Sequence, residues 1–397
     1  MNPTASAARQ RAATRSALGQ RVTSAWWETS RAATDGVLDY WGSAMRRRAT
    51  PLQLGIEALE WMAISIRRDV PQWSTPNTVV FDTPIARLRD FTPPDRAGTA
   101  VIPTLVLPPQ AGHSSCIVDF SPDQSQLGAI REAGLLRVFS MDWKGATQET
   151  KNAGIDDYLA VLQTAVVHLG GRVNLIGDCQ GGWLAVIYAA LHPEQINTLT
   201  IAGAPIDYHC GEPLLHDWVK GLSLNGGLAF YRRVVAAGGG VLKGKYMLSG
   251  FQSLKPDQEV ARQVKLLANV RDPRHVERYR AFETWFQYTQ DFPGAFYLWI
   301  VEHLFANNEL IRGELVIGER RVDLAAIDAP LFLLGGANDH ITPPDQVFAL
   351  ADHASTPPER IGRRSTTGGH LGLFMGHEAL TEHWPPLLAG VRALSVP

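Results

Sequence analysis

Residues 173–182 read VNLIGDCQGG, a run of apolar and β-branched residues that ends in a cysteine between glycines. The run predicts a buried strand, and the apolar stretch WLAVIYAA over residues 183–190 predicts a helix directly after it. Gly177 and Gly181 flank Cys179 in the pattern of a nucleophile elbow, G-x-S-x-G, with cysteine in place of serine. The sequence therefore predicts that a strained strand-to-helix turn exposes the sulfur above the edge of a sheet.

Two further residues complete a candidate catalytic triad. The turn would place the backbone N–H of Gln180 beside the sulfur and at a helix N-terminus, where it can donate to an oxyanion. A nucleophilic cysteine also needs a base and a carboxylate that orients the base. Asp339 follows a predicted strand, and His370 lies in the glycine-rich loop TGGHLG over residues 367–372. The chain order Cys179, Asp339, His370 is the order of α/β-hydrolases.

His340 is the competing base. Its position directly after Asp339 favours a supporting or substrate-facing role. A metal site built from Asp339, His340 and His370 is disfavoured, because no H-x-E or H-E-x-x-H signature accompanies them. We therefore expect no metal and no cofactor.

The second oxyanion donor is expected in the loop LPPQAGH, residues 107–113, which follows an early predicted strand. Gly112 would let a backbone N–H approach the substrate. His113 has two open interpretations, a residue that lines the site or a loop histidine with a structural hydrogen bond.

Strand and helix patterns alternate through much of the chain. Strands are predicted at residues 78–81, 104–107, 138–142, 173–176, 198–202 and 330–334. Helices between them, such as residues 155–169, imply a mostly parallel, doubly wound sheet, which is the α/β-hydrolase fold. The long helical stretch before the last of these strands exceeds a simple crossover and predicts an inserted helical cap. The predicted divisions are an N-terminal tail and helical segment (1–75), the core (76–207), the cap (208–322) and the rest of the core (323–397).

Composition restricts the function and the location. The 37 Lys and Arg against 39 Asp and Glu give a net charge of −2, which argues against nucleic acid as a partner. The three cysteines have no metal-site or disulfide-scaffold spacing, so a reducing cytoplasm is expected. No signal peptide and no transmembrane segment are predicted. The arginines before residue 24 are interpreted as part of a solvated tail.

The N-terminal segment is rich in tryptophan. Five of the 11 tryptophans lie before residue 75, so this helical segment must pack on something apolar. The favoured interpretation is packing on the main core, and a partner subunit or the surface of a hydrophobic particle are the alternatives.

The chain resembles the polyhydroxyalkanoate synthase family, above all its short subunits, whose nucleophile box is G-x-C-x-G-G. Further matches over about residues 135–390 are Asp142-Trp143, SLKP at 253–256, Asp272-Pro273, Asn307-Asn308, VDL at 322–324, Asp339-His340 and GGH at 368–370. The resemblance implies that Cys179 carries the acyl chain of a 3-hydroxyacyl-CoA, that His370 is the general base and that Asp339 orients it. It also implies that Trp285 lies in the cap near the site. An accessory subunit, a polyester granule surface and a homodimer are the expected partners.

One segment departs from the synthase pattern. PPQAGH at residues 108–113 is more similar to the P-x-S-G-H segment of intracellular polyhydroxyalkanoate depolymerases, which share the fold and the cysteine. Hydrolysis of an ester or thioester by the same triad is therefore the alternative to polymerisation. A non-catalytic granule-associated protein is the third hypothesis, and the intact triad argues against it. The aromatic stretch 282–306 fits either an acyl channel or core packing.

Overall fold

The chain forms two compact units, and each is described by itself. Unit 1 consists of Met1–Val70 and Leu248–Tyr288, and unit 2 consists of Pro71–Met247 and Thr289–Pro397. The predicted cap is thus divided, because residues 248–288 belong with the N-terminal segment rather than with the rest of 208–322. The computed structural model describes residues 27, 29–66, 69–96, 98–211, 227–254 and 256–396. The predicted N-terminal tail lies outside them.

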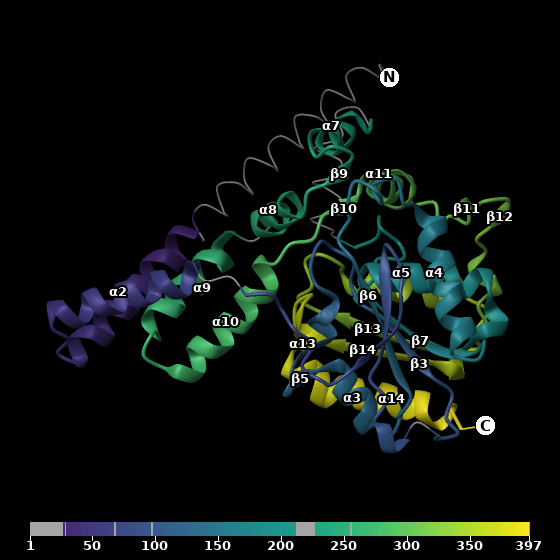
Figure 1. Cartoon of the computed structure of the whole chain (residues 1–397), viewed down its shortest axis with the longest axis horizontal. Coiled ribbons are helices and arrows are strands. Elements are labelled where there is room, and N and C mark those ends of the chain that lie inside the picture. The colour runs from purple at the N-terminus through teal and green to yellow at the C-terminus, as the bar shows by residue number, and fades with distance from the viewer. Residues whose placement is uncertain are drawn as a thin grey trace, which may run out of the picture. The chain divides into compact units, whose positions relative to one another are not determined.

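An eight-stranded sheet forms the centre of unit 2, in the order β1-β2-β6-β3-β7-β8-β13-β14 (Figure 1). Its strands are β1 (Thr78–Asp82), β2 (Ala86–Asp90), β6 (Val138–Trp143), β3 (Thr104–Leu107), β7 (Val173–Asp178), β8 (Ile196–Ala202), β13 (Leu331–Gly336) and β14 (Ile361–Thr366). The strands from β6 to β14 pair in parallel, and β1 and β2 join antiparallel at one end. The predicted mostly parallel sheet is confirmed.

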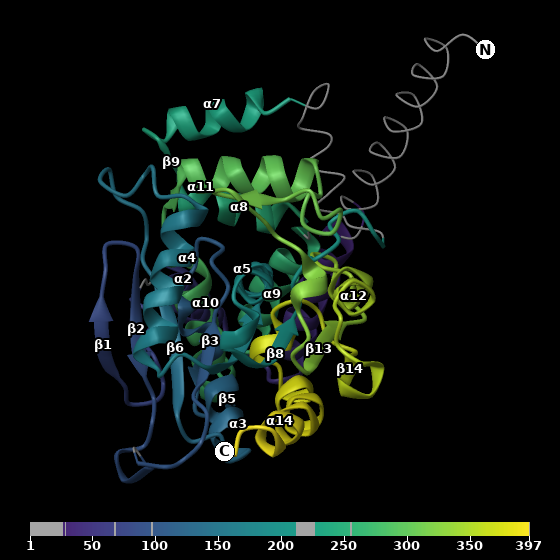
Figure 2. The same ribbon diagram turned by 90° about the vertical axis from the view of Figure 1, so that its right-hand side faces the viewer.

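Helices cover both faces of this sheet, as two views at right angles show (Figures 1 and 2). One face carries α4 (Ile155–His168) and α5 (Gln180–Leu191), and the other carries α3 (Gln126–Glu132) and α14 (Trp384–Ala393). Every residue of β7 and β8 is buried. A strand that lies between two helical layers is buried on both of its faces, which explains why both strands are rich in apolar and β-branched residues.

A further part of unit 2 is mainly helical. It comprises α7 (Ala229–Ala237), the short pair β9 (Val241–Leu242) and β10 (Phe292–Pro293), and α11 (Gly294–Trp299), which continues as a π-helix to Ala306. Phe296 is fully buried and stacks on Tyr158 of α4, with ring centroids 4.3 Å apart. Phe292 stacks on Phe296 in turn. For these two aromatic residues of the 282–306 stretch, the structure therefore favours core packing.

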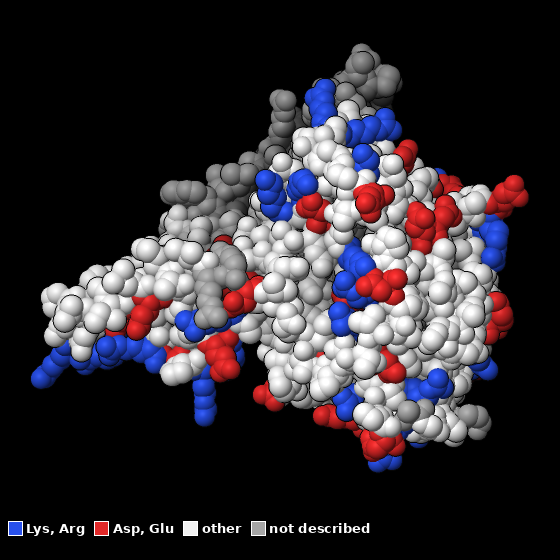
Figure 3. All heavy atoms as spheres, in the orientation of Figure 1, with Lys and Arg blue, Asp and Glu red and all other residues white. Residues whose placement is uncertain are grey.

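Unit 1 is helical in its described residues. A helix over residues 29–46 and α2 (Pro51–Ile66) come from the N-terminal part, and α9 (Pro256–Ala268) and α10 (Pro273–Gln287) come from the later part. α8 (Gly244–Leu254) crosses the boundary between the units. One apolar cluster among the described residues of unit 1 consists of Ile64, Leu266, Val270, Val276 and Tyr279, with Trp61 packed against it. In Figure 3 most of the visible face of this unit is uncharged, and Lys and Arg gather along its lower edge.

None of the helices in the described parts of the chain is both long and apolar enough to cross a membrane.

Candidate active site

The turn after β7 has the predicted strained geometry. Cys179 has φ 51° and ψ −118°, and it directly precedes α5. A positive φ is rare for a residue with a side chain and commonly marks a functional turn. Gly181 is required for close packing, because a Cβ there would lie 2.0 Å from the carbonyl oxygen of Leu107 in β3. The elbow is therefore pressed against the carboxyl end of the neighbouring strand, where the sulfur faces the other loops of that edge.

Parallel pairing of β13 and β14 brings the next two residues together. The register ends at Gly336 opposite Thr366, so the loops that follow the two strands leave the sheet side by side. A Cβ at Gly336 would lie 2.7 Å from the carbonyl oxygen of Gly368, which shows how closely these loops approach. His370 Nδ1 and Asp339 Oδ2 are 2.7 Å apart as a result.

Both carboxylate oxygens of Asp339 have partners. Oδ1 accepts from the backbone N–H groups of Ile341 and Thr342, each at 2.9 Å, while Oδ2 is hydrogen-bonded to Nδ1 of His370. These contacts fix the orientation of the carboxylate, and the carboxylate fixes the imidazole ring. The partner of Asp339 is therefore His370. His340 lies in the turn directly after Asp339, half-buried, and its predicted supporting role stays a prediction.

The electrostatics of the site favour a charged histidine. Burial lowers the pKa of His370, but the charge of Asp339, the charge of Cys179 and hydrogen bonds to both raise it well above its ordinary value. Cys179 is 9% exposed, His370 6% and Asp339 4%. A nearly dry site strengthens the attraction between a charged His370 and the carboxylate of Asp339. The three residues of the predicted triad are thus in one cluster.

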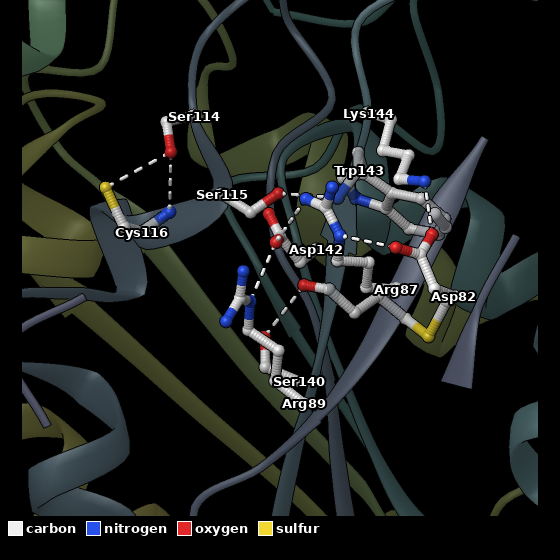
Figure 4. Close-up of polar contacts among 12 residues, drawn as sticks. Asp82, Arg87, Arg89, Ser114, Ser115, Cys116, Ser140, Asp142, Trp143 and Lys144 are labelled. Carbon is white, nitrogen blue, oxygen red and sulfur yellow. Dashed lines mark hydrogen bonds and ion pairs between the residues drawn. The ribbon is translucent and has the colours of Figure 1, made fainter. Parts of the chain in front are cut away.

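The loop after β3 is attached to β6 by Trp143. The indole Nε1 of Trp143 donates to the carbonyl oxygen of Pro108, and its backbone N–H donates to Ser115 Oγ, both at 2.9 Å. Figure 4 shows the second of these contacts beside the ion pair of Asp142 with Arg89, whose Nε lies 2.7 Å from Oδ2. Trp143 therefore holds the loop that is expected to form the oxyanion hole, while Asp142 pairs with the arginines of β2.

Within that loop, Gly112 has φ 77°, which glycine adopts without strain. Its role as an oxyanion donor stays a prediction, as does that of Gln180. His113 is buried, and its Nδ1 lies 3.1 Å from the carbonyl oxygen of Ala111. The structural interpretation of His113 thus has an observed hydrogen bond, and contact with substrate stays a prediction.

Two further buried residues belong to this edge of the sheet, and of these Tyr208 was not considered in the sequence analysis. Tyr208 follows β8 on the carboxyl edge of the sheet, and burial together with the charge of Cys179 raises the pKa of its phenol well above the ordinary value. Asp178 precedes Cys179, is fully buried and accepts a hydrogen bond from Gln126. The position of Tyr208 just after a predicted strand was the available signal for including it.

Trp285 and the two other cysteines remain to be described. Trp285 is on α10 of unit 1, where it packs against Phe282 and Phe286, and its contact with substrate stays a prediction. Cys116 and Cys210 are free, and burial raises the pKa of their thiols to about 11 and about 12. The described residues contain no group of three or more His, Cys, Asp or Glu that could hold a metal ion.

The sheet order and the position of the Cys, Asp and His residues at its carboxyl edge define an α/β-hydrolase enzyme. A family model described as "Protein of unknown function (DUF3141)" matches residues 82–375, which is most of the 397-residue chain. The chain belongs to this family.

Curated relatives have more specific names. The chain is 27% identical over 281 residues to the poly(3-hydroxyalkanoate) polymerase subunit PhaC of Allochromatium vinosum, covering 68% of this chain and 75% of that one. It is 26% identical over 325 residues to the subunit of the same name from Haloferax mediterranei, covering 80% of this chain and 64% of that one. A solved hydrolase from Pseudomonas aeruginosa has 18% identity and a TM-score of 0.46, and the match covers 80% of this chain and 97% of that one.

Proposed function

We propose that this enzyme is a cysteine-nucleophile acyltransferase of polyhydroxyalkanoate metabolism, which takes a 3-hydroxyacyl group from coenzyme A onto Cys179. The observation that carries the proposal is the strained Cys179 turn beside a His370 that Asp339 holds at 2.7 Å. The similarity to polymerase subunits supports the substrate class.

The first half-reaction would exchange one thioester for another. With Nδ1 of His370 bound to Asp339, Nε2 is the nitrogen left to take the thiol proton of Cys179. The thiolate attacks the acyl carbonyl, and the oxyanion that forms accepts from the backbone N–H of Gln180 at the start of α5. Collapse of the intermediate breaks the C–S bond to coenzyme A, whose sulfur takes the proton from His370.

The second half-reaction would extend the polyester. His370 removes the proton of a chain-end hydroxyl, which attacks the carbonyl of acyl-Cys179. An ester bond forms, the bond to Cys179 breaks and the thiol recovers the proton. The enzyme returns to its starting state.

The loop after β3 would supply the second oxyanion donor. Pro108 and Pro109 have no N–H, so the donor must come from residues 110–113, which include Gly112. Trp143 keeps this loop in place by its bond to Pro108.

The alternative activity is hydrolysis of a polyester or thioester by the same triad, with water attacking acyl-Cys179. The PPQAGH segment favours it, because this segment is similar to that of intracellular depolymerases. A non-catalytic granule-associated role is the least favoured, since Cys179, Asp339 and His370 are in one cluster.

In this proposal unit 1 supplies the surface for a granule, an accessory subunit or a second copy, and the enzyme acts in the cytoplasm. Its described helices expose many large apolar side chains. They are Trp27, Val37, Leu38, Trp41, Met45, Leu52, Ile56, Leu59, Met62 and Ile66.

The test is release of free thiol from 3-hydroxybutyryl-CoA by the purified full chain, with Cys179→Ala as the control and the products separated into insoluble polymer and soluble acid. Thiol release with polymer is expected. Release with soluble acid alone would support the hydrolase alternative. No release, together with hydrolysis of a polyester by the wild type but not by Cys179→Ala, would support depolymerisation.

A further inference from the structure

Asp178 points away from the helix that follows the nucleophile. Side chains alternate across a strand, and Gly177 faces α5, because a Cβ there would lie 2.6 Å from the Cα of Gly182. Asp178, the next residue, therefore faces the opposite side of the sheet, where α3 lies (Figure 1). There Gln126 Nε2 donates to Asp178 Oδ1 at 3.1 Å, and both side chains are fully buried.

This pair has two oxygens without partners. Asp178 Oδ2 and Gln126 Oε1 are buried, and neither has a hydrogen-bond partner. An ionised carboxylate has no proton to donate, so it cannot pair with Oε1. Leaving buried polar atoms unpaired is unfavourable. One proton on Oδ2 would remove both deficits, because the acid could then donate to Gln126 Oε1 while Oδ1 accepts from Nε2. Burial raises the pKa of Asp178 to about 8, which supports the protonated form at neutral pH.

We propose that Asp178 is a neutral carboxylic acid in a cyclic acid–amide pair with Gln126, and that this pair positions the Cys179 turn without placing a negative charge beside its thiolate. Asp178 and Gln126 are positioning residues in this account, since they act through Cys179. The effect on the thiolate rests on the proposed function. The protonation state of Asp178 does not.

The charged surroundings of Asp178 are few. The strands that flank β7, β3 and β8, carry no titratable residue. α5 carries Tyr188, and α3 carries Arg131 and Glu132 at its far end. His370 is the group whose charge acts on Asp178, and as an imidazolium it lowers the pKa of the acid, but burial has the larger effect.

The proposal predicts a particular dependence of stability on pH. The native protein would keep the proton of Asp178 up to about pH 8, whereas an unfolded aspartate loses it near pH 4. Between these values the native state binds more protons than the unfolded state, so this group makes the protein less stable as the pH rises. Asp178→Asn has no such proton, yet its amide can donate to Gln126 Oε1 and accept from Nε2.

The experiment compares the wild type, Asp178→Asn and Asp178→Leu in the full chain. Tm is measured from pH 5 to pH 9, and the rate at which iodoacetamide alkylates Cys179 is measured by peptide mass spectrometry, with Cys116 and Cys210 as reference thiols. We expect Asp178→Leu to lower Tm and change the alkylation rate severalfold, and Asp178→Asn to restore both. The Tm of Asp178→Asn should rise relative to wild type from pH 5 to pH 8 and change no further above it.

Infrared spectra provide a second measurement. The wild type at pH 6 should show a protonated carboxyl band that Asp178→Asn lacks. A Tm difference that does not depend on pH, or the absence of this band, would overturn the protonation state. An Asp178→Asn protein that reacts like Asp178→Leu would show that a carboxylate is required instead. Because Tm and infrared spectra need no substrate, the pair can hold even if no acyl-CoA is turned over, which separates this proposal from the proposed function.

Discussion

Unit 2 has a large continuous apolar core on both faces of its sheet, whereas the described helices of unit 1 meet around a buried glutamate. In unit 1, Glu57 is 1% exposed and contacts Arg47 at 2.8 Å and Arg271 at 2.7 Å, and Tyr40 donates to it at 3.0 Å. Arg271 thereby ties the later helices to the N-terminal ones. Among the described residues, the apolar cluster around Leu266 in unit 1 is smaller than the continuous core of unit 2.

This difference indicates where strain can be held. A left-handed Cys179 is unfavourable, and the rigid packing of β7, β3 and α5 is what maintains it. Unit 1 has no comparable apolar framework in its described residues, and it depends on ion pairs with partly exposed arginines. We therefore expect some substitutions at the unit 2 site to lower activity without lowering Tm. Substitutions in unit 1 should lower the stability of unit 1 itself.

Cys179→Ala should have the largest effect. Removal of the nucleophile is expected to lower acyl transfer by at least about 10³-fold, while Tm changes little or rises because a small residue relieves crowding in the turn. Thiol release and thermal unfolding on the same sample test this. Retention of wild-type activity would contradict the role of Cys179.

Asp339→Asn should have the next largest effect. An amide at this position keeps the shape but removes the charge that stabilises an imidazolium and selects its tautomer, so we expect a loss of about 10²–10⁴-fold in kcat. The pH dependence of alkylation of Cys179 is the second measurement, because the pKa of His370 should fall without Asp339. His340→Gln is the matched control. A loss in His340→Gln as large as that in His370→Gln would contradict the assignment of His370 as the base.

A pair of matched core substitutions sharpens the comparison of the units. Leu266 in unit 1 and Leu199 in unit 2 are both fully buried, and replacement of either by alanine should destabilise its surroundings by about 2–5 kcal/mol. Hydrogen exchange measured by peptide should report faster opening in unit 1 for Leu266→Ala, with β7 and β8 unchanged. Leu199→Ala should affect the sheet instead. Equal changes throughout the chain in both variants would mean that the units unfold together.

Glu57→Gln should have the smallest effect of this set, about 1–3 kcal/mol, because both arginines are partly exposed. Hydrogen bonding from Arg47 lowers the pKa of Glu57 despite burial. Its contribution is therefore present above the unfolded value, about pH 4, and is lost as the pH falls through the lower folded value. Hydrogen exchange in α2 should rise in acid for the wild type and depend less on pH in Glu57→Gln. Parallel pH curves would contradict this assignment.

Much of the active site could be predicted from the sequence because it depends on local chain geometry. Gly177, Cys179 and Gly181 specify the turn through backbone sterics alone, and the runs that became β3, β7 and β8 are apolar since both faces are covered. The chain order Cys179, Asp339, His370 was sufficient to predict that Asp339 orients His370. The choice between His370 and His340 as the partner of Asp339 depended on the parallel register of β13 and β14.

Other features could not be predicted because they depend on distant residues. β2 reads ARLRD and β14 reads IGRRST, and neither looks like a strand on its own. In β2 the arginines are compensated by Asp142 across the sheet. Likewise, nothing local indicates that Gln126 meets Asp178, or that residues 248–288 pack with the N-terminal helices instead of the rest of the predicted cap.

The most direct test of the account is to trap the acyl-enzyme. The full chain is mixed with 3-hydroxybutyryl-CoA, quenched in acid and digested, and the peptide that contains Cys179 is weighed by mass spectrometry beside those of Cys116 and Cys210. We predict a 3-hydroxybutyryl adduct on Cys179 alone, absent from Cys179→Ala and accumulated in His370→Gln if deacylation is slowed more than acylation. Turnover of the thioester with no adduct on Cys179, or with an equal adduct on all three cysteines, would contradict the central claim.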